Sequence, residues 1–148
     1  MLVLAALQAH KLSLNDLTFK APNLRTILAI LIFMLASGFQ HDCHNYLAYL
    51  KANKSEDGKA AEQSYKLPTH PAFQSLIAPH YFAECLIYLS LTILAAPQGA
   101  WLNNTIASAL VFVMVNLGAT AEVTRQWYVK TFGQDVVKGK WRMIPLVY

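Results

Sequence analysis

A histidine, a carboxylate and a tyrosine stand four residues apart at the start of an apolar segment. His80, Glu84 and Tyr88 follow Pro79, a residue that favours the first turn of a helix. On a helix the three share one face, and the stretch from Cys85 to Ala96 carries no charge. An ionisable residue in a membrane segment is costly and marks a functional site by default. In a soluble helix, His80 and Glu84 at this spacing would make an ordinary local side-chain contact.

Two further polar sets interrupt apolar segments. Gln40 and His44 share a helical face, and the simpler interpretation is the interfacial end of a helix. The second set recurs every fourth residue and consists of Asn116, Thr120, Thr124 and Tyr128. We expect this edge to face the interior of a helix bundle, because lipid would leave its amides and hydroxyls unpaired. Hydrogen bonding between helices is the alternative role.

The composition indicates a membrane protein. The chain has 148 residues, 55% of them hydrophobic and 14% charged, with a net charge of +4. This is one domain or part of one, and it is unusually apolar for a soluble protein. The basic residues form no stripe with aromatic residues, so we expect no nucleic-acid partner. Cys43 and Cys85 lack metal-ligand spacing and lie in apolar surroundings, which predicts buried thiols and no metal site.

Three apolar segments are long enough to cross a bilayer, which takes about 20 residues as a helix. They predict an all-α integral membrane fold with spans near Ile27 to Leu47, Leu76 to Ala96 and Trp101 to Ala121. Lysines and arginines gather between the first two spans and after the third, whereas the hairpin from Pro97 to Asn104 has none. By the positive-inside tendency, loop 51–75 and the tail are cytosolic.

Several short motifs follow one another in a fixed order from Gly38 to the end of the chain. They are G-x-Q-x-x-C-H, L-A-x-L-K, Y-K-L-P, P-H-Y-F-A-E, N-L-x-x-x-A, W-Y-x-K-x-F and a closing I-P. In this order and spacing they resemble the C-terminal half of the polyprenol reductase branch of the steroid 5α-reductase family. The resemblance divides the chain into an N-terminal segment, 1–26, without a clear family match and a family-like C-terminal domain, 27–148.

The resemblance implies an NADPH-dependent oxidoreductase, a multi-pass protein of the endoplasmic reticulum membrane whose cofactor is held at the cytosolic ends of the helices. Carried over by motif, Gln40 and His44 would contact the nucleotide, and Tyr65 and Lys66 would contact its ribose and phosphates. His80 and Glu84 would hold the nicotinamide side of the cofactor. Tyr128 would close the site from the last helix. Glu84 would accept a hydrogen bond from the carboxamide. Polar residues from three expected helices thus fall near one positively flanked face, which suits an anionic cofactor.

The chain departs from the family pattern in three respects. It reads Asp135-Val136-Val137 where the family usually has an aspartate-tyrosine-proline triplet. Arg125 stands where a histidine is usual; it can keep a phosphate contact but cannot exchange a proton near neutral pH. The acidic and tyrosine residues that polarise the substrate belong to upstream helices, and Met1 to Gly38 has no match for them. No residue here is therefore assigned to catalysis. We expect the cofactor half of the enzyme, either as a truncated chain or as a divergent short form, to be inactive alone.

The expected reaction reduces the α-isoprene double bond of a polyprenyl lipid in dolichol synthesis, which supports protein N-glycosylation. Hydride addition needs a conjugated carbonyl to take up negative charge, which favours polyprenal over polyprenol as the substrate at the chemical step. Two alternatives stay open. One is a steroid or enoyl-thioester reductase of the same superfamily, and the other is a non-catalytic membrane fragment.

Overall fold

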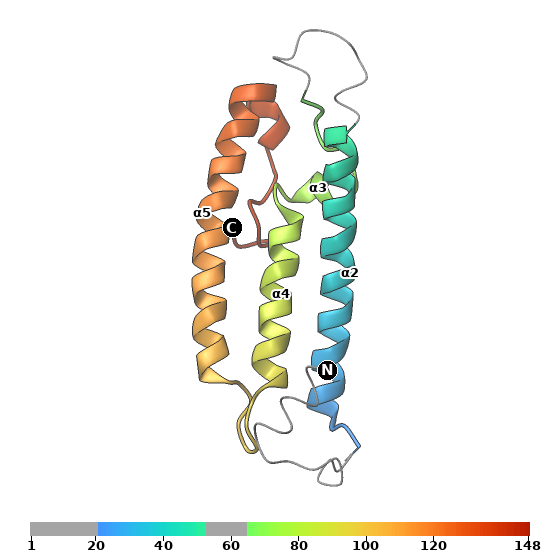
Figure 1. Cartoon of the computed structure of the whole chain (residues 1–148). Helices are drawn as coiled ribbons and strands as arrows, with labels where there is room; N and C mark the ends of the chain where they lie inside the picture. The colour runs from blue at the N-terminus through green and yellow to red at the C-terminus, as the bar shows by residue number, and fades with distance from the viewer. Residues whose placement is uncertain (1–20, 53–64) are drawn as a thin grey trace.

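Two long helices and a shorter one between them lie side by side in the computed structural model, which describes residues 21–52 and 65–148 (Figure 1). The helices are α2 (Leu24–Ala52), α3 (Ala72–Ser75), α4 (Pro79–Leu94) and α5 (Asn104–Phe132), followed by the 3-10 helix η2 (Gln134–Val137). No strand occurs within those two ranges, and their one β-bridge joins Leu76 to Trp141. The predicted all-helical fold is confirmed for this part of the chain.

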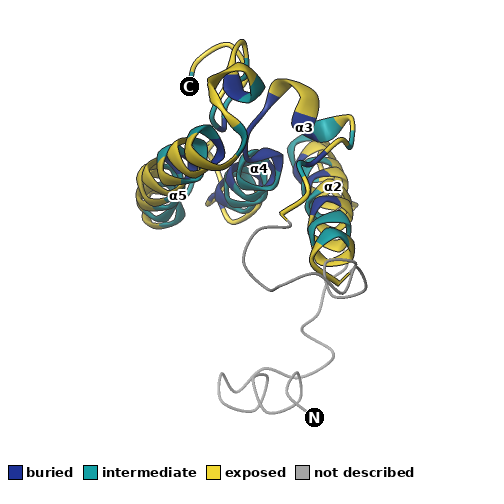
Figure 2. Ribbon diagram, turned by 90° about the horizontal axis from the view of Figure 1, so that it is seen from above, coloured by how far each residue is buried: buried dark blue, intermediate teal, exposed yellow. Residues whose placement is uncertain are grey.

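The short helix α4 occupies the middle of the bundle. It packs against α2 on one side and α5 on the other, and the view from above shows its buried residues between the two longer helices (Figure 2). The outer faces of α2 and α5 stay exposed and strongly apolar, with Leu31, Leu35, Phe112 and Val115 among the exposed residues. Exposed apolar faces of this kind are typical of helices that meet lipid or further helices.

Two of the expected spans are present as long apolar helices. By length and hydropathy, α2 and α5, with 29 residues each, are candidate membrane spans. The middle segment is shorter than expected, because α4 has 16 residues. Its N-terminal end differs from the prediction of a helix from Leu76, because Leu76 is extended, Ile77 and Ala78 are not helical, and Pro79 begins the helix. Likewise α5 begins at Asn104 rather than Trp101, since the Asn103 side chain caps it.

The C-terminal tail folds back onto the start of α4. Gly133 ends α5 with a φ of 93°, a conformation that glycine adopts readily, and the chain turns into η2. The backbone N–H groups of Ile77 and Ala78 then donate to the carbonyls of Trp141 and Arg142 at 2.8 and 3.0 Å. These bonds satisfy backbone groups ahead of α4 that no helix would pair.

Two small apolar clusters fix the tail. Ile77 packs with Tyr128 and Val137, and Ala78 packs in the cluster that contains Cys85 and Met143. Both cysteines are buried free thiols, as expected. The end of the bundle where α5 stops is thus tied to the start of α4.

The polar edge expected on the third span does not face α4. Asn116 and Thr120 are exposed, and the hydroxyls of Thr120 and Thr124 donate to the carbonyls of Asn116 and Thr120 at 2.9 and 3.0 Å. A hydroxyl that bonds to the carbonyl four residues earlier needs no partner on another helix. The expectation of a buried edge is therefore wrong for these residues, and on this line only Tyr128 is buried.

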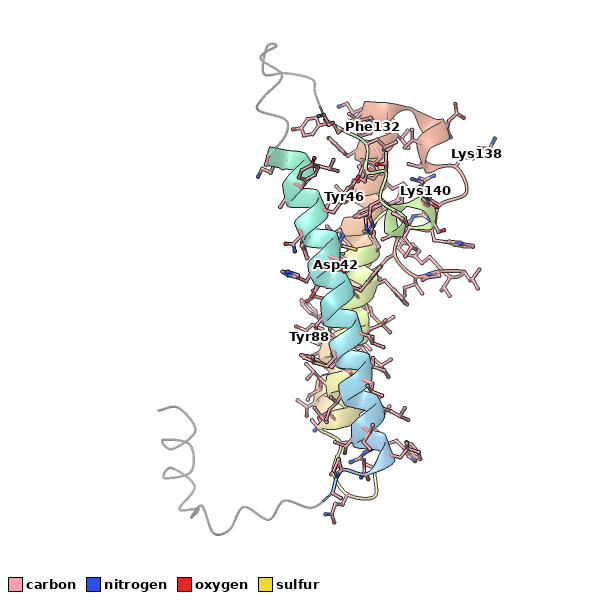
Figure 3. All side chains as sticks on the ribbon, turned by 90° about the vertical axis from the view of Figure 1, so that its right-hand side faces the viewer. Asp42, Tyr46, Tyr88, Phe132, Lys138 and Lys140 are labelled. Atoms are coloured by element: carbon pink, nitrogen blue, oxygen red, sulfur yellow. The ribbon has the colours of Figure 1, made fainter. Side chains whose placement is uncertain are left out.

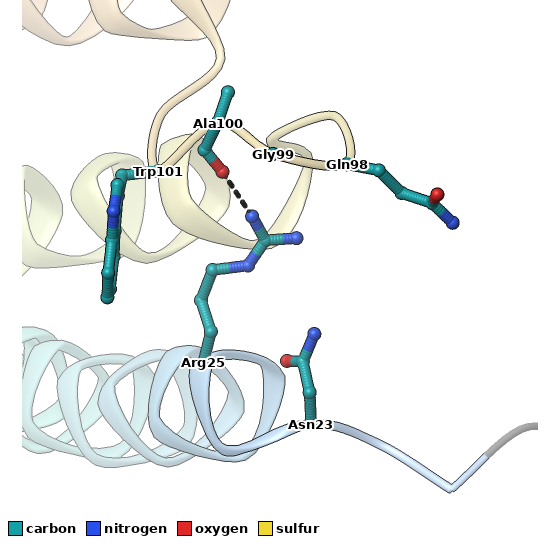
Figure 4. Close-up of a pocket in the computed structure, with 6 residues that line it drawn as sticks. All are labelled: Asn23, Arg25, Gln98, Gly99, Ala100 and Trp101. Atoms are coloured by element: carbon teal, nitrogen blue, oxygen red, sulfur yellow. Dashed lines mark hydrogen bonds between the residues drawn. The ribbon is translucent and has the colours of Figure 1, made fainter.

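Arg25 fastens the opposite end of the bundle. Its guanidinium, from the first turn of α2, donates to the carbonyl of Ala96 at 3.1 Å. It also donates to the carbonyl of Ala100, and Figure 4 shows this second bond. Carbonyls after the end of a helix lack intrahelical partners, and a cation there also complements the helix dipole. Arg25 thus joins α2 to the connection between α4 and α5.

We expect Arg25→Ala to lower the free energy of unfolding by about 2 kcal/mol, because each lost bond joins a charged donor to a carbonyl. Arg25→Lys should lower the free energy of unfolding by less, since lysine keeps the positive charge but cannot donate to both carbonyls in the planar geometry of a guanidinium. Far-UV circular dichroism during denaturant titration in detergent measures both. Lys130→Ala, at an exposed position of α5, is the control, and equal destabilisation by Arg25→Ala and this control would refute the role.

Candidate functional site

Polar side chains of α2 and α4 meet across the interface between these helices. The Gln40 amide donates a hydrogen bond to a carboxylate oxygen of Glu84. One turn along, the imidazole rings of His44 and His80 lie with their centroids 5.1 Å apart. Each helix contributes two residues spaced by four, so the two contacts lie one helical turn apart along the same interface. The structure therefore brings together four of the residues predicted from sequence.

His80 has an unsatisfied ring nitrogen. Its Nδ1 is buried and has no hydrogen-bond partner among the residues that the structure describes. A buried polar atom without a partner costs free energy, so this nitrogen needs a partner such as a water molecule or a ligand group. The ring itself is held in place, since it contacts Tyr81 at 4.3 Å and the buried Phe73 at 6.4 Å between centroids.

A cavity of about 300 Å³ lies beyond this cluster, towards the C-terminal end of α2. Its lining residues are Leu47, Leu50, Lys51, Tyr65, Lys66, Pro68, Trp127 and Tyr128. The rings of Tyr65 and Trp127 meet edge to face with centroids 5.0 Å apart. Two ammonium groups beside aromatic rings suit a ligand that is both anionic and aromatic. Tyr65, Lys66 and Tyr128, all predicted site residues, therefore share one cavity.

One face of α2 connects the polar cluster to the cavity. Gln40, His44, Leu47 and Lys51 are spaced by four, three and four residues, which keeps them on the same side of the helix. Eleven residues of α-helix correspond to about 16 Å. The site is therefore elongated, with neutral and acidic hydrogen-bonding groups at one end and cations at the other.

Tyr46 was not singled out in the sequence, yet it holds the chain segment that closes the cavity. Its hydroxyl accepts a hydrogen bond from the Thr69 amide at 2.8 Å and lies 3.2 Å from the Thr69 hydroxyl. Its ring also packs against His70 and Phe73. Figure 3 shows Tyr46 on α2 near the end of the bundle where Phe132 ends α5. A single tyrosine in an apolar segment gives no signal of such a contact, because its partners lie 23 residues away.

Arg125 lies apart from these groups. It lines a different cavity, formed with the C-terminal tail, and its guanidinium is 3.7 Å from the carboxylate of Glu122. Trp127 and Lys51, which the sequence reasoning missed, line the first cavity instead. Trp127 sits in the W-Y-x-K-x-F motif, so the motif itself was the available signal.

These features define a helical bundle with two membrane-length apolar helices and an elongated polar site towards one end. The sequence model of the 3-oxo-5-alpha-steroid 4-dehydrogenase family matches residues 4–148. The chain belongs to this family, as the order of its motifs predicted. Across the described ranges, no group of three histidine, cysteine or acidic residues could hold a metal ion.

Several curated relatives are polyprenal reductases. The chain is 33% identical over 137 residues to the polyprenal reductase of Xenopus laevis, an alignment that covers 92% of this chain and 40% of the relative. It is 29% identical over 120 residues to polyprenal reductase 1 of Oryza sativa subsp. indica, covering 81% and 31%. The human polyprenal reductase is 27% identical over 106 residues, covering 72% and 31%. The chain thus spans two fifths or less of these relatives' length. No solved structure matches it.

We expect Tyr46→Phe to loosen the segment that contains Thr69, because the variant removes the acceptor of the Thr69 amide. One lost hydrogen bond of about 1 kcal/mol corresponds to roughly five-fold faster amide exchange. Hydrogen–deuterium exchange over residues 66–72 measures it. Tyr49→Phe, at an exposed position one turn along α2, should leave the exchange unchanged. Parental exchange at Thr69 in Tyr46→Phe would contradict the contact.

Proposed function

We propose that this chain carries the NADPH-binding part of a polyprenal reductase of the endoplasmic reticulum membrane. The relatives named above support the substrate class. The observation that carries the proposal is the meeting of two polar pairs between α2 and α4, Gln40 with Glu84 and His44 with His80, near a cavity with two lysines. The buried Nδ1 of His80 has no partner among the described residues. This donor and acceptor set fits a nicotinamide at one end of the site and phosphates at the other.

The polar cluster would hold the nicotinamide side of the cofactor. Glu84 would accept from the carboxamide N–H, and Gln40 keeps that carboxylate in place through its own hydrogen bond. The buried Nδ1 of His80 offers a further polar contact, and the nearby ring of His44 adds a contact with the nucleotide. NADPH, when bound, supplies the hydride.

The cavity at the end of α2 would receive the ribose and phosphates. Lys66 and Lys51 provide positive charge, and Tyr65 with Trp127 provides flat apolar surface. Tyr128 forms the wall on the α5 side, because it is buried against Ile77 and Val137. An anionic ligand is stabilised here without crossing the apolar part of the bundle.

The proposed substrate is polyprenal, whose conjugated carbonyl takes up negative charge when hydride adds to the α-isoprene double bond. The product is the saturated lipid that leads to dolichol, and through it the reaction supports N-glycosylation. Removing a hydrogen-bond donor to such a developing oxyanion typically costs about 10²-fold to 10³-fold in rate. We assign no residue of this chain to that donor.

The proposed topology has three spans, with α4 as the short central one. Its 16 residues extend about 24 Å, slightly less than the roughly 30 Å of a hydrocarbon core. The non-helical residues 76–78 before it and the connection after it would complete the crossing. Basic residues beyond α5 and their absence from residues 97–104 favour a cytosolic tail.

Cysteine labelling in sealed microsomes tests this topology. We expect a cysteine at Lys130 to react with a membrane-impermeant maleimide, and a cysteine at Gln98 to react only after detergent is added. Background labelling should be low, because Cys43 and Cys85 are buried. The reverse pattern would overturn the orientation. Labelling of both cysteines without detergent would show that α5, the third span, does not cross the membrane.

Glu84→Gln tests the cofactor site in a chimera. Residues 27–148 replace the matching part of the Xenopus laevis polyprenal reductase, and the chimera is expressed in yeast that lacks its own enzyme. We expect the chimera to restore dolichol, and Glu84→Gln to raise the KM for NADPH about ten-fold or more, because a charged hydrogen bond contributes roughly 1.5–3 kcal/mol.

Asp42→Asn is the matched control, since it changes a carboxylate to an amide at an exposed position of α2 (Figure 3). It should keep the parental KM. A parental KM in Glu84→Gln would refute the cofactor assignment. A stable chimera that binds NADPH but restores no dolichol would refute polyprenal as the substrate.

A further inference from the structure

A second, basic cavity lies between the end of α5 and the C-terminal tail. It has a volume of about 540 Å³ and is lined by Arg125, Gln134, Asp135, Val137, Lys138, Gly139, Lys140, Trp141 and Arg142. Figure 3 shows Lys138 and Lys140 where the tail turns back along the bundle. The proposed cofactor site uses none of the tail residues in this cavity.

The cavity has an excess of positive charge. Glu122 forms ion pairs with Arg142 and, at 3.7 Å, with Arg125. Neither Lys138 nor Lys140 has an ion-pair partner in the described part of the chain. Partial burial lowers the pKa of the Lys140 amine, so an anion there would replace hydration that this amine has lost. The two lysines are thus available to an external anion. Asp135 is the one acidic residue among the residues that line this cavity.

An apolar groove lies next to the basic cavity and shares no lining residue with it. It has a volume of about 310 Å³ and is lined by Met114, Val115, Gly118, Ala119, Met143, Ile144 and Tyr148. Arg142 lines the basic cavity, and its guanidinium lies 4.9 Å from the centre of the ring of Tyr148, which lines the groove. Met143, the next residue, lines the groove.

The groove leads along α5 towards the segment that would cross the membrane. From Arg125 to Met114 there are eleven residues of helix, or about 16 Å. The tail beside the groove exposes apolar side chains, with Leu146 at 82% and Val147 at 74% relative exposure. Trp141, at 39%, lines the basic cavity and suits a headgroup region. Cations followed by an apolar groove match the order of groups in one lipid molecule.

We propose that this cavity and the neighbouring groove together bind one anionic phospholipid, with its phosphate at Lys138 and Lys140 and one acyl chain in the groove. Basic pockets at the ends of membrane helices recognise such headgroups. The site is separate from the cofactor cavity, because Tyr128 packs on Val137 between the two. The proposal is therefore independent of the proposed reaction.

Native mass spectrometry of the full chain in detergent measures the affinity for dioleoylphosphatidylserine and for dioleoylphosphatidylcholine. We expect tighter binding of the serine lipid, and about five-fold weaker binding of it in both Lys138→Ala and Lys140→Ala, from about 1 kcal/mol for each cation. Lys130→Ala removes the same charge from α5 outside the cavity and should have a smaller effect. Equal effects of all three variants would show a diffuse charge effect and overturn the site.

The groove is tested by Ala119→Phe, which fills it, against Val123→Phe on the exposed surface of α5 outside the groove. We expect only Ala119→Phe to weaken binding of the serine lipid, with both variants keeping parental helicity. Unchanged binding in Ala119→Phe would show that no acyl chain occupies the groove.

Soluble competitors distinguish the sources of phosphate. We expect neither NADPH nor inorganic phosphate, at millimolar concentration, to displace the serine lipid, because neither fills the groove. Displacement by NADPH that depends on Lys138 would assign the cavity to the cofactor, and displacement by inorganic phosphate would assign it to phosphate alone. Either result would overturn the lipid proposal.

Discussion

The hydrogen bond between Gln40 and Glu84 is the contact on which the arrangement of the site depends. A carboxylate between two largely apolar helices needs a partner, because an unpaired polar group there costs several kcal/mol. Pairing it with Gln40 fixes the register of α2 against α4. The same register places His44 beside His80 one turn along. A shift of one residue on α2 would turn both side chains away from α4.

Other contacts position the second part of the site, at the end of the bundle. Beyond His44, the same face of α2 reaches the cavity at Lys51, and Tyr46 fixes the chain segment around Thr69 against α2. On the other side the tail pairs with the non-helical residues before α4, which places Tyr128 in the cavity wall. Polar chemistry is therefore gathered at one end, while the exposed outer faces of α2 and α5 stay apolar.

Local spacing predicted much of this site. Residues four apart share a helical face whatever surrounds them, so the pairs Gln40 with His44 and His80 with Glu84 could be recognised from the sequence. Which helix each pair faces depends on packing. Only the family resemblance indicated that the two pairs belong to one site. The edge that begins at Asn116 shows the limit of spacing, because its hydroxyls are satisfied within their own helix and leave it exposed.

Long-range contacts account for what the sequence did not predict. Residues 76–78 have the hydropathy of a helix, yet they pair with the tail more than sixty residues later. Arg125 lies in a motif attributed to cofactor binding, yet Glu122 and the tail hold it in another cavity. Neither outcome follows from propensity or periodicity, since tertiary contacts override both.

Histidine resonances give the most direct test that the α2–α4 cluster is a nicotinamide site. In the full chain labelled with ¹³C at histidine Cε1, NADPH should shift the signals of His44 and His80 and leave that of the exposed His41 unchanged. The analogue 2′-phospho-ADP-ribose, which lacks the nicotinamide, should not shift the His80 signal. Equal shifts of His80 by both ligands, or no shift at saturating NADPH, would contradict the assignment.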